Sequence, residues 1–199
     1  MWLGEPALIL AISAAVLGLL FAIRRILARA PASTPLGRTT SDARDSRGIA
    51  GVIAPPPLIF LGFLALAAVL EAVVPTPTTA LFPYVRYAAG TSLFVIGLVI
   101  GIAGVRGLRA SGTNISTDLP ATALVVDGIY RWSRNPLYLA MTLLYIGLAI
   151  AAGSAWAIML LIPLQVVMNI GVISREERYL EREFGEAYRA YKSCVRRWL

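Results

Sequence analysis

Two polar clusters interrupt an otherwise apolar chain, and their residue types are those that bind charged ligands. The first cluster is residues 124–138, where Arg131 and Arg134 stand close to an Asn135-Pro136 step. A residue before Pro avoids helical backbone, whereas Pro is tolerated in a first helical turn, so this step predicts the start of a helix. The bare N–H groups of a helix start beside Arg134 suit a carboxylate or a phosphate.

The second cluster opens the charged tail, residues 174–199, with the run Arg175-Glu176-Glu177-Arg178. Such a run on its own is typical of a solvated surface. Together with Arg134 it favours a ligand that carries both charges, because cationic and anionic groups then meet at one place. The chain has no histidine, which excludes a His base, a His metal ligand and a Ser-His-Asp triad, and we expect no metal.

The composition predicts an integral membrane protein. Hydrophobic residues make up 58% of the 199, the mean hydropathy is +0.73, and the charged residues fall between and after apolar runs. The net charge of +7 therefore indicates the positive-inside bias of membrane proteins, and we expect no nucleic acid as a partner. Cys194 is the single cysteine, so a disulfide within the monomer is excluded.

Five apolar runs predict membrane-spanning helices, at residues 6–23, 58–74, 87–105, 137–152 and 155–173. Only Gly153 and Ser154 separate the last two, so these must form an antiparallel hairpin. In the tail, apolar side chains recur at intervals of four, four and three residues, which predicts an amphipathic helix. The expected fold class is an all-α integral membrane protein with about five transmembrane helices and a C-terminal cytoplasmic amphipathic helix.

The chain divides into two expected parts. Residues 1–110 hold three spans and a cytoplasmic loop at about 24–50, and residues 111–199 hold a catalytic connector, the hairpin and the C-terminal helix. Of the 18 basic residues, 6 lie in residues 24–48, 4 in 106–134 and 7 after 174, which leaves Arg86 alone on the other side. We therefore expect the N-terminus outside and the C-terminus in the cytoplasm, with both polar clusters at the cytoplasmic end of the hairpin.

Polar and small residues within the apolar runs have two kinds of explanation. Gly97, Gly101 and Gly104 share a face of the third span, and this small-residue pattern predicts close helix packing. Gln165 and Asn169, four residues apart on the fifth span, either form hydrogen bonds between helices or line a polar ligand cavity.

The two clusters together resemble a known superfamily. The segments that carry the resemblance are Gly128-Ile129-Tyr130, then Arg134-Asn135-Pro136-Leu137-Tyr138, then a hairpin, and then Glu176-Glu177 seven residues before Phe184-Gly185, with Tyr188 and Tyr191 following. This arrangement is similar to that of the isoprenylcysteine carboxyl methyltransferase and phospholipid methyltransferase superfamily. The similarity covers about residues 120–195.

The resemblance implies an all-helical membrane enzyme that binds S-adenosylmethionine and methylates a lipophilic acceptor from the bilayer. It implies a catalytic group of Arg134, Asn135 and Tyr138, and a cofactor site of Tyr130, Asn135, Pro136, Tyr138, Glu176 and Glu177. We add Gln165 and Asn169 to the cofactor site, because they lie beneath both clusters on the fifth span. Much of the superfamily has His where this chain has Asn135, which cannot shuttle a proton near neutral pH.

The nature of the acceptor follows from its need for a base. A carboxylate is already ionised, whereas an amine with a pKa of roughly 10 has to lose a proton, and only Glu176, Glu177, Asp127 or water could take it. We therefore expect a reaction most like isoprenylcysteine carboxyl methylation. The alternative is N- or O-methylation of a phospholipid, another lipid or a small molecule.

Two other classes of function stay open. Related C-terminal folds occur in membrane reductases that use NADPH, and a small membrane protein of this kind could also be a non-catalytic transporter or assembly protein. Expected partners are the lipophilic acceptor and membrane lipids, and the sequence does not determine the oligomeric state.

Overall fold

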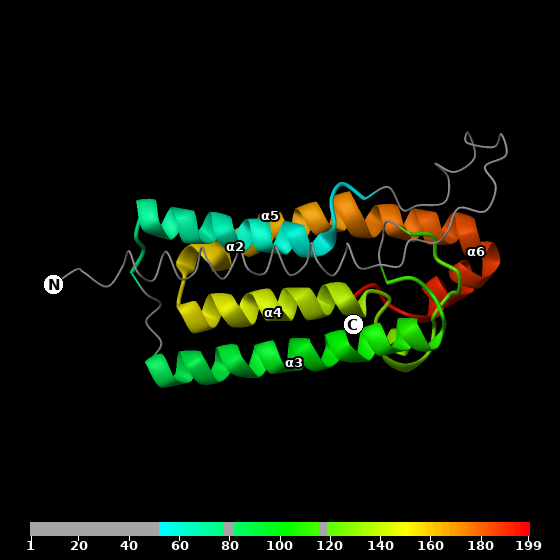
Figure 1. The fold of residues 1–199 in the computed structure, drawn as a ribbon, viewed down its shortest axis with the longest axis horizontal. Coiled ribbons are helices and arrows are strands. Elements are labelled where there is room, and N and C mark those ends of the chain that lie inside the picture. The colour runs from blue at the N-terminus through cyan, green and yellow to red at the C-terminus, as the bar shows by residue number, and fades with distance from the viewer. Residues whose placement is uncertain (1–51, 78–81, 116–118) are drawn as a thin grey trace, which may run out of the picture. The chain divides into compact units, whose positions relative to one another are not determined.

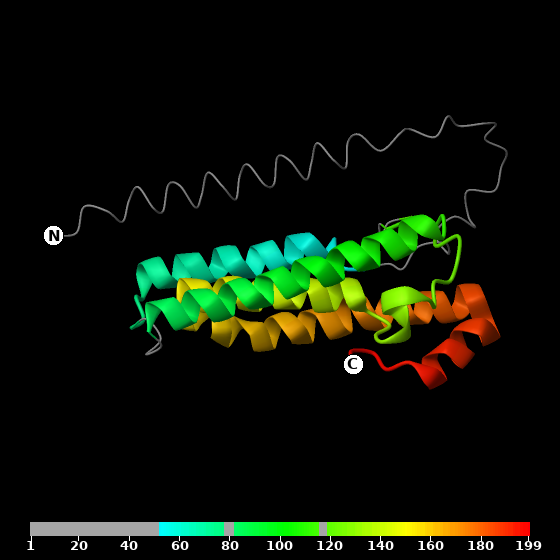
Figure 2. The ribbon, with the colours of Figure 1, turned by 90° about the horizontal axis from the view of Figure 1, so that it is seen from below.

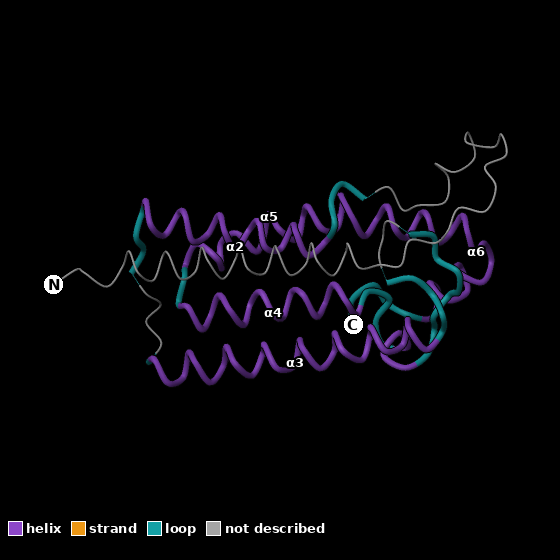
Figure 3. Tube along the Cα trace, in the orientation of Figure 1, coloured by secondary structure: helices purple, strands orange, loops and turns teal. Residues whose placement is uncertain are grey.

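The structure is a computed structural model, and it describes residues 52–77, 82–115 and 119–199. The described elements are α2 (Pro56–Val73), α3 (Pro83–Ala110), the 3₁₀-helix η2 (Gly128–Arg131), α4 (Pro136–Ala152), α5 (Ala155–Val167), the π-helix η3 (Met168–Ile173) and α6 (Ser174–Cys194). These residues form helices and loops and contain no strand (Figure 3). The expected span at 6–23 and the expected loop at 24–50 lie outside the described residues.

Helices α2, α3, α4 and α5 lie side by side in both ribbon views (Figures 1 and 2). Three helices are long and apolar enough to cross a membrane, namely α2, α3 and the continuous helix from Ala155 to Cys194, and α4 is a shorter apolar helix. The described residues therefore hold three to four candidate spans, and the full count of five stays a prediction. The all-helical class is confirmed.

Proline and turn residues set the helix boundaries. Pro56, Pro83 and Pro136 each begin a helix, at the position where the missing N–H of proline costs no hydrogen bond. Gly153 ends α4 in the left-handed region at φ 68°, and the Ser154 hydroxyl accepts a 3.2 Å bond from the N–H of Ala157 at the start of α5. The hairpin predicted from the two-residue link is thus confirmed.

Glycines bring α3 and α4 into close contact. A Cβ on Gly90 would lie 2.7 Å from the Gly147 carbonyl oxygen, and one on Gly97 would lie 2.9 Å from the Ala140 carbonyl oxygen. A Cβ on Gly104 would meet the Leu137 side chain at 2.7 Å. The close packing predicted from the small residues is confirmed, and it fixes the start of α4 against α3.

The C-terminal helix differs from its prediction. Gly185 has φ 55° and ψ −122°, a backbone conformation that residues with a Cβ avoid, so α6 breaks there into two halves. The second half turns back beside the first, and the chain returns toward the start of α4 (Figure 2). The expected single amphipathic helix is therefore two helical segments.

Candidate functional site

The first turn of α4 contacts the first turn of α6 through one short hydrogen bond. The Tyr138 hydroxyl donates to Glu176 Oε2 at 2.5 Å, across 38 residues of sequence. Burial raises the pKa of the Glu176 carboxyl, the bond from Tyr138 opposes this shift, and the neighbouring Glu177 adds to it. The two polar clusters that the sequence places in separate segments thus meet.

Glu177 has a different environment from Glu176. It is only 5% exposed, and both of its oxygens are bound by Arg197, Oε1 by Nε at 3.0 Å and Oε2 by Nη2 at 2.6 Å. Arg134 adds a third contact, with its Nη2 3.5 Å from Glu177 Oε1. This carboxylate is already neutralised by two guanidinium groups.

Arg134 uses only part of its guanidinium group. Its side chain is 10% exposed, and its buried Nε and Nη1 have no hydrogen-bond partner. A buried N–H without a partner costs about 1 to 3 kcal/mol, and more when the group is charged. Because Arg134 and Arg197 carry two positive charges against one on Glu177, this buried cluster retains a positive charge and two donors that suit an anion.

Tyr188 and Tyr191 of α6 lie near the guanidinium of Arg134. Burial raises the pKa of Tyr191 to about 12, against the charge of Arg134, which acts in the opposite direction. The Tyr191 hydroxyl donates a 2.6 Å bond to the Tyr130 carbonyl oxygen, and the Tyr130 hydroxyl donates a 3.5 Å bond to the Gly104 carbonyl oxygen of α3. Tyr130 therefore ties α6 to α3 beside the cluster.

Asn135 is held from the C-terminal side of the chain. It is 8% exposed, and its Nδ2 donates to the Arg197 carbonyl oxygen at 3.1 Å. Its backbone N–H donates to the Ser133 hydroxyl at 3.1 Å, and Pro136 follows as the buried first residue of α4. This geometry orients the Asn135 amide by a bond to the main chain.

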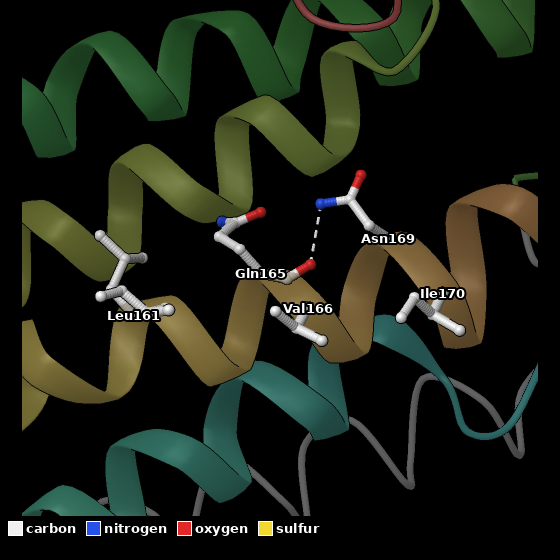
Figure 4. A pocket seen from close by; sticks show the side chains of 6 residues that line it. Leu161, Gln165, Val166, Asn169 and Ile170 are labelled. Atoms are coloured by element: carbon white, nitrogen blue, oxygen red, sulfur yellow. Dashed lines mark hydrogen bonds between the residues drawn. The ribbon is translucent and has the colours of Figure 1, made fainter.

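Gln165 and Asn169 form a polar row along α5 and η3 (Figure 4). Gln165 Nε2 donates to the Thr142 hydroxyl at 2.8 Å, and Thr142 in turn donates to the Tyr138 carbonyl oxygen at 2.8 Å. Asn169 Nδ2 donates to the Gln165 carbonyl oxygen at 2.8 Å. Gln165 thus makes the bond between helices that the sequence allowed, and the two side-chain amide oxygens take no part in these bonds.

The helix spacing shows how these residues converge. Tyr138 and Thr142 are one turn apart, about 6 Å along α4, whereas Gln165 and Glu176 are separated by about 16 Å of helix. Tyr138 bonds to Glu176 and Thr142 bonds to Gln165, so the side chains of Gln165 and Glu176 reach neighbouring turns of α4 although they start far apart on their own helix. Asn169 lies between Gln165 and Glu176 in the sequence. An open groove of about 460 Å³ follows this row, lined by Leu161, Ile162, Gln165, Val166, Asn169 and Ile170.

The structure brings most of the predicted site residues to one place. The residues that meet where α4 and α6 begin are Arg134, Asn135, Tyr138, Glu176 and Glu177. Gln165 is linked to this group by its hydrogen bond to Thr142, which bonds to Tyr138. Tyr130 links α6 to α3 beside this group, and Pro136 is the buried first residue of α4.

Arg197, Ser133 and Thr142 were missed by the sequence analysis. No local signal pointed to Arg197, because it lies 20 residues from Glu177 and reaches it only through the fold of the tail. Among the residues that the structure describes, no group of three or more His, Cys, Asp or Glu could hold a metal ion.

Helices that can cross a membrane and a cluster of both charges where α4 and α6 begin are the features of the described fold. The model of the phospholipid methyltransferase family matches residues 85–187, just over half of the chain. The protein belongs to this family, within the isoprenylcysteine and phospholipid methyltransferase superfamily. Membership implies a membrane methyltransferase, and methyltransferases of this family generally use S-adenosylmethionine.

One relative from Haemophilus influenzae carries no functional description. This uncharacterized protein is 41% identical over 63 residues, which is 32% of the present chain and 100% of the relative. No solved structure matches the chain.

Proposed function

We propose that the protein transfers a methyl group from S-adenosylmethionine to a lipophilic acceptor, at the end of the hairpin where α4 and α6 begin. The observation that carries this proposal is the buried guanidinium of Arg134, in which the nitrogens Nε and Nη1 have no partner, close to the Glu177 carboxylate. The amino-acid end of S-adenosylmethionine carries a carboxylate and an ammonium group, so it requires both signs of charge.

The residues present fit such a ligand. Arg134 Nε and Nη1 would hold its carboxylate, because they are buried donors without an acceptor. Glu176 would hold its ammonium, since Glu177 is already neutralised by Arg197 and Arg134 whereas the neutral Tyr138 is the hydrogen-bond partner of Glu176 among the described residues. When bound, S-adenosylmethionine supplies an electrophilic methyl group on a sulfonium, and the burial of the site would exclude water from it.

The groove beside Gln165 and Asn169 supports a lipid acceptor. Its apolar lining includes Ile162, Val166 and Ile170, which are exposed along one side of α5 and η3 and suit an acyl or prenyl chain. One N–H of each amide group of Gln165 and Asn169 is used in these bonds, and the two amide oxygens would be available as acceptors for a ligand.

This orientation favours an acceptor that donates hydrogen bonds, such as an amine or a hydroxyl group, over a carboxylate. Methylation of a phospholipid or of another lipid amine or alcohol therefore fits this geometry better than isoprenylcysteine carboxyl methylation. The acceptor nitrogen or oxygen would give its proton to water as it takes the methyl group, because Glu176 and Glu177 are engaged elsewhere in the site.

Ligand binding and turnover by the purified protein in lipid nanodiscs test this proposal. We expect saturable binding of S-adenosylmethionine and none of NADPH, and methyl transfer to phosphatidylethanolamine rather than to a farnesylated cysteine. Preferential binding of NADPH would favour a reductase, and binding of neither ligand would favour a non-catalytic role. Transfer to the farnesylated cysteine alone would keep the methyltransferase and overturn the proposed acceptor.

The role of Arg134 can be separated by the Arg134→Gln variant. Loss of a charge-assisted hydrogen bond should weaken S-adenosylmethionine binding by about ten- to a hundredfold if this residue holds the cofactor carboxylate. Unchanged cofactor affinity with lost turnover would instead place Arg134 at the acceptor. Unchanged affinity and unchanged turnover would show that the buried cluster is not the site.

A further inference from the structure

The last described residues form a separate segment, which we call the strap, Val195–Leu199. Helix α6 ends at Cys194, and Val195 takes extended backbone with φ −118° and ψ 132°. From there the strap runs across the loop that precedes α4. The Arg134 N–H donates to the Arg196 carbonyl oxygen at 3.0 Å, and the Ser133 hydroxyl donates to the Arg197 carbonyl oxygen at 3.2 Å.

Within the described part of the chain, the polar side chains that attach the strap belong to the candidate site or to its immediate neighbour Ser133. The Asn135 amide donates to the Arg197 carbonyl oxygen, and the Arg197 guanidinium binds both oxygens of Glu177. Trp198 packs against the hydrophobic core at the far end of the strap. The strap thus lies against residues 133–135 and Glu177, beside the groups assigned to the cofactor.

The side chains beside the strap are nearly inaccessible to solvent. Glu177 is 5% exposed and Asn135 8%, and the Arg134 side chain is 10% exposed. A ligand the size of S-adenosylmethionine cannot reach them unless an element moves. The starts of α4 and α6 are continuous with apolar helices, whereas the strap follows a helix break at Gly185 and its Arg197 side chain is 37% exposed.

We propose that the strap opens to admit S-adenosylmethionine and closes over it, and that Arg197 is the positioning residue that holds the strap closed through Glu177. This inference rests on the proposed function. The Glu177–Arg197 pair is the one ionic attachment of the strap among the described residues, so its loss should make the strap open more often. Opening exposes the unpartnered face of Arg134, and closure excludes water from it.

The rates of S-adenosylmethionine binding test the strap, measured by stopped-flow fluorescence on the full chain in nanodiscs. In Arg197→Gln we expect both the association and the dissociation rate to rise about tenfold, the effect of one lost charge-assisted hydrogen bond, with Kd changed less than about threefold. Arg197→Lys keeps one contact and should lie between. The control variant Arg189→Gln removes an exposed ion pair with Glu186 within α6, and its binding rates should match those of the parent.

An association rate that stays at the parental value in Arg197→Gln, with a raised Kd, would make Arg197 a ligand contact or a structural residue and overturn the strap. Amide hydrogen exchange of Arg134 gives a second readout that needs no ligand, because its N–H is protected by the Arg196 carbonyl. We expect exchange about tenfold faster in Arg197→Gln than in the parent, and slower in the parent once S-adenosylmethionine is added. Equal exchange in both proteins overturns the strap, whereas faster exchange in a protein that binds no S-adenosylmethionine overturns only the proposed function.

Discussion

Glu176 and Glu177 are adjacent in the chain, yet the first carboxylate is bonded to the neutral hydroxyl of Tyr138 and the second lies between the guanidinium groups of Arg134 and Arg197. Adjacent positions on a helix point about 100° apart, so the pair can serve two purposes. Glu177 completes a buried ion cluster, and Glu176 retains a charge that no cation in this cluster neutralises.

The two glutamates should therefore respond differently to neutralisation. Glu177→Gln leaves the buried guanidinium of Arg134 and the partly exposed one of Arg197 without their anion. We expect it to lower stability by about 1 to 3 kcal/mol, seen as a lower Tm in detergent. Glu176→Gln keeps an oxygen for the Tyr138 hydroxyl, so Tm should hold while S-adenosylmethionine affinity falls by about tenfold or more. If instead Glu176→Gln lowered Tm and Glu177→Gln lowered S-adenosylmethionine affinity, the two residues would have the opposite roles.

The pH dependence of binding and of stability should have opposite signs. The Glu176 carboxyl has a raised pKa in the folded protein, so the folded state holds this proton more tightly than the unfolded state. The stability from this group is then fully present below the ordinary carboxyl pKa and is lost as pH rises through the raised value. Cofactor affinity should instead rise over the same range, because only the carboxylate pairs with an ammonium group.

Thermal melts and S-adenosylmethionine titrations from about pH 4.5 to about pH 8 would check both trends. The Glu176→Gln variant is the control, since it has no carboxyl group to titrate at this position. If this variant kept the parental pH dependence of affinity, another group would be responsible.

Close packing of α3 on α4 predicts a strong effect of single methyl groups. Gly90→Ala and Gly97→Ala each place a Cβ within 3 Å of a backbone oxygen of α4, and backbone cannot rotate away as a side chain can. We expect each to lower stability by roughly 1 to 3 kcal/mol. Gly62→Ala on α2 is the matched control, because nothing lies within 4 Å of its new methyl group, and its Tm should hold or rise slightly.

Gln165 and Asn169 should separate into a structural and a ligand-binding residue. Gln165→Leu removes the bond to Thr142 on α4 and should lower Tm. Asn169 bonds only within its own helix, so Asn169→Leu should leave Tm nearly unchanged and raise the KM for the acceptor. A drop in Tm for Asn169→Leu with parental KM would make both residues structural.

The orientation predicted from the basic residues can be tested with the single native thiol. Cys194 is exposed, so an impermeant maleimide should label it in intact cells only after permeabilisation. Tyr84→Cys on a Cys194→Ser background places a thiol in the first turn of α3, at the end that we expect to lie outside, where it should label without permeabilisation. The reverse pattern would invert the topology and place the site outside.

Local signals predicted the start of α4 and the hairpin. Asn135-Pro136 marked the start of α4 because the restriction on backbone before proline is local, and Gly153-Ser154 gave the turn for a similar reason. The meeting of the two polar clusters was also predictable, since a two-residue link leaves the two helices of a hairpin little choice of partner.

The partner of Glu177 was not predictable in the same way. Arg197 reaches it only because α6 breaks at Gly185 and the strap folds back, and both depend on contacts between distant segments. The sequence spacing of four, four and three residues in the tail suggests one continuous helix instead. The roles of the site residues themselves stay predictions, which the variants above test.

The π-helix Met168–Ile173 acts as a phase shift between α5 and α6. A π turn accommodates about one more residue than an α turn, and each residue of a helix rotates the next by about 100°. The π-helix therefore sets the rotation of α6 relative to α5. It determines which side of α6 faces Tyr138 and Arg134 while another side of α5 lines the groove. Changes in the apolar groove can alter which lipid is accepted without rotating Glu176 or Glu177, whereas deletion of one residue from Met168–Ile173 would turn both carboxylates away from α4 at once.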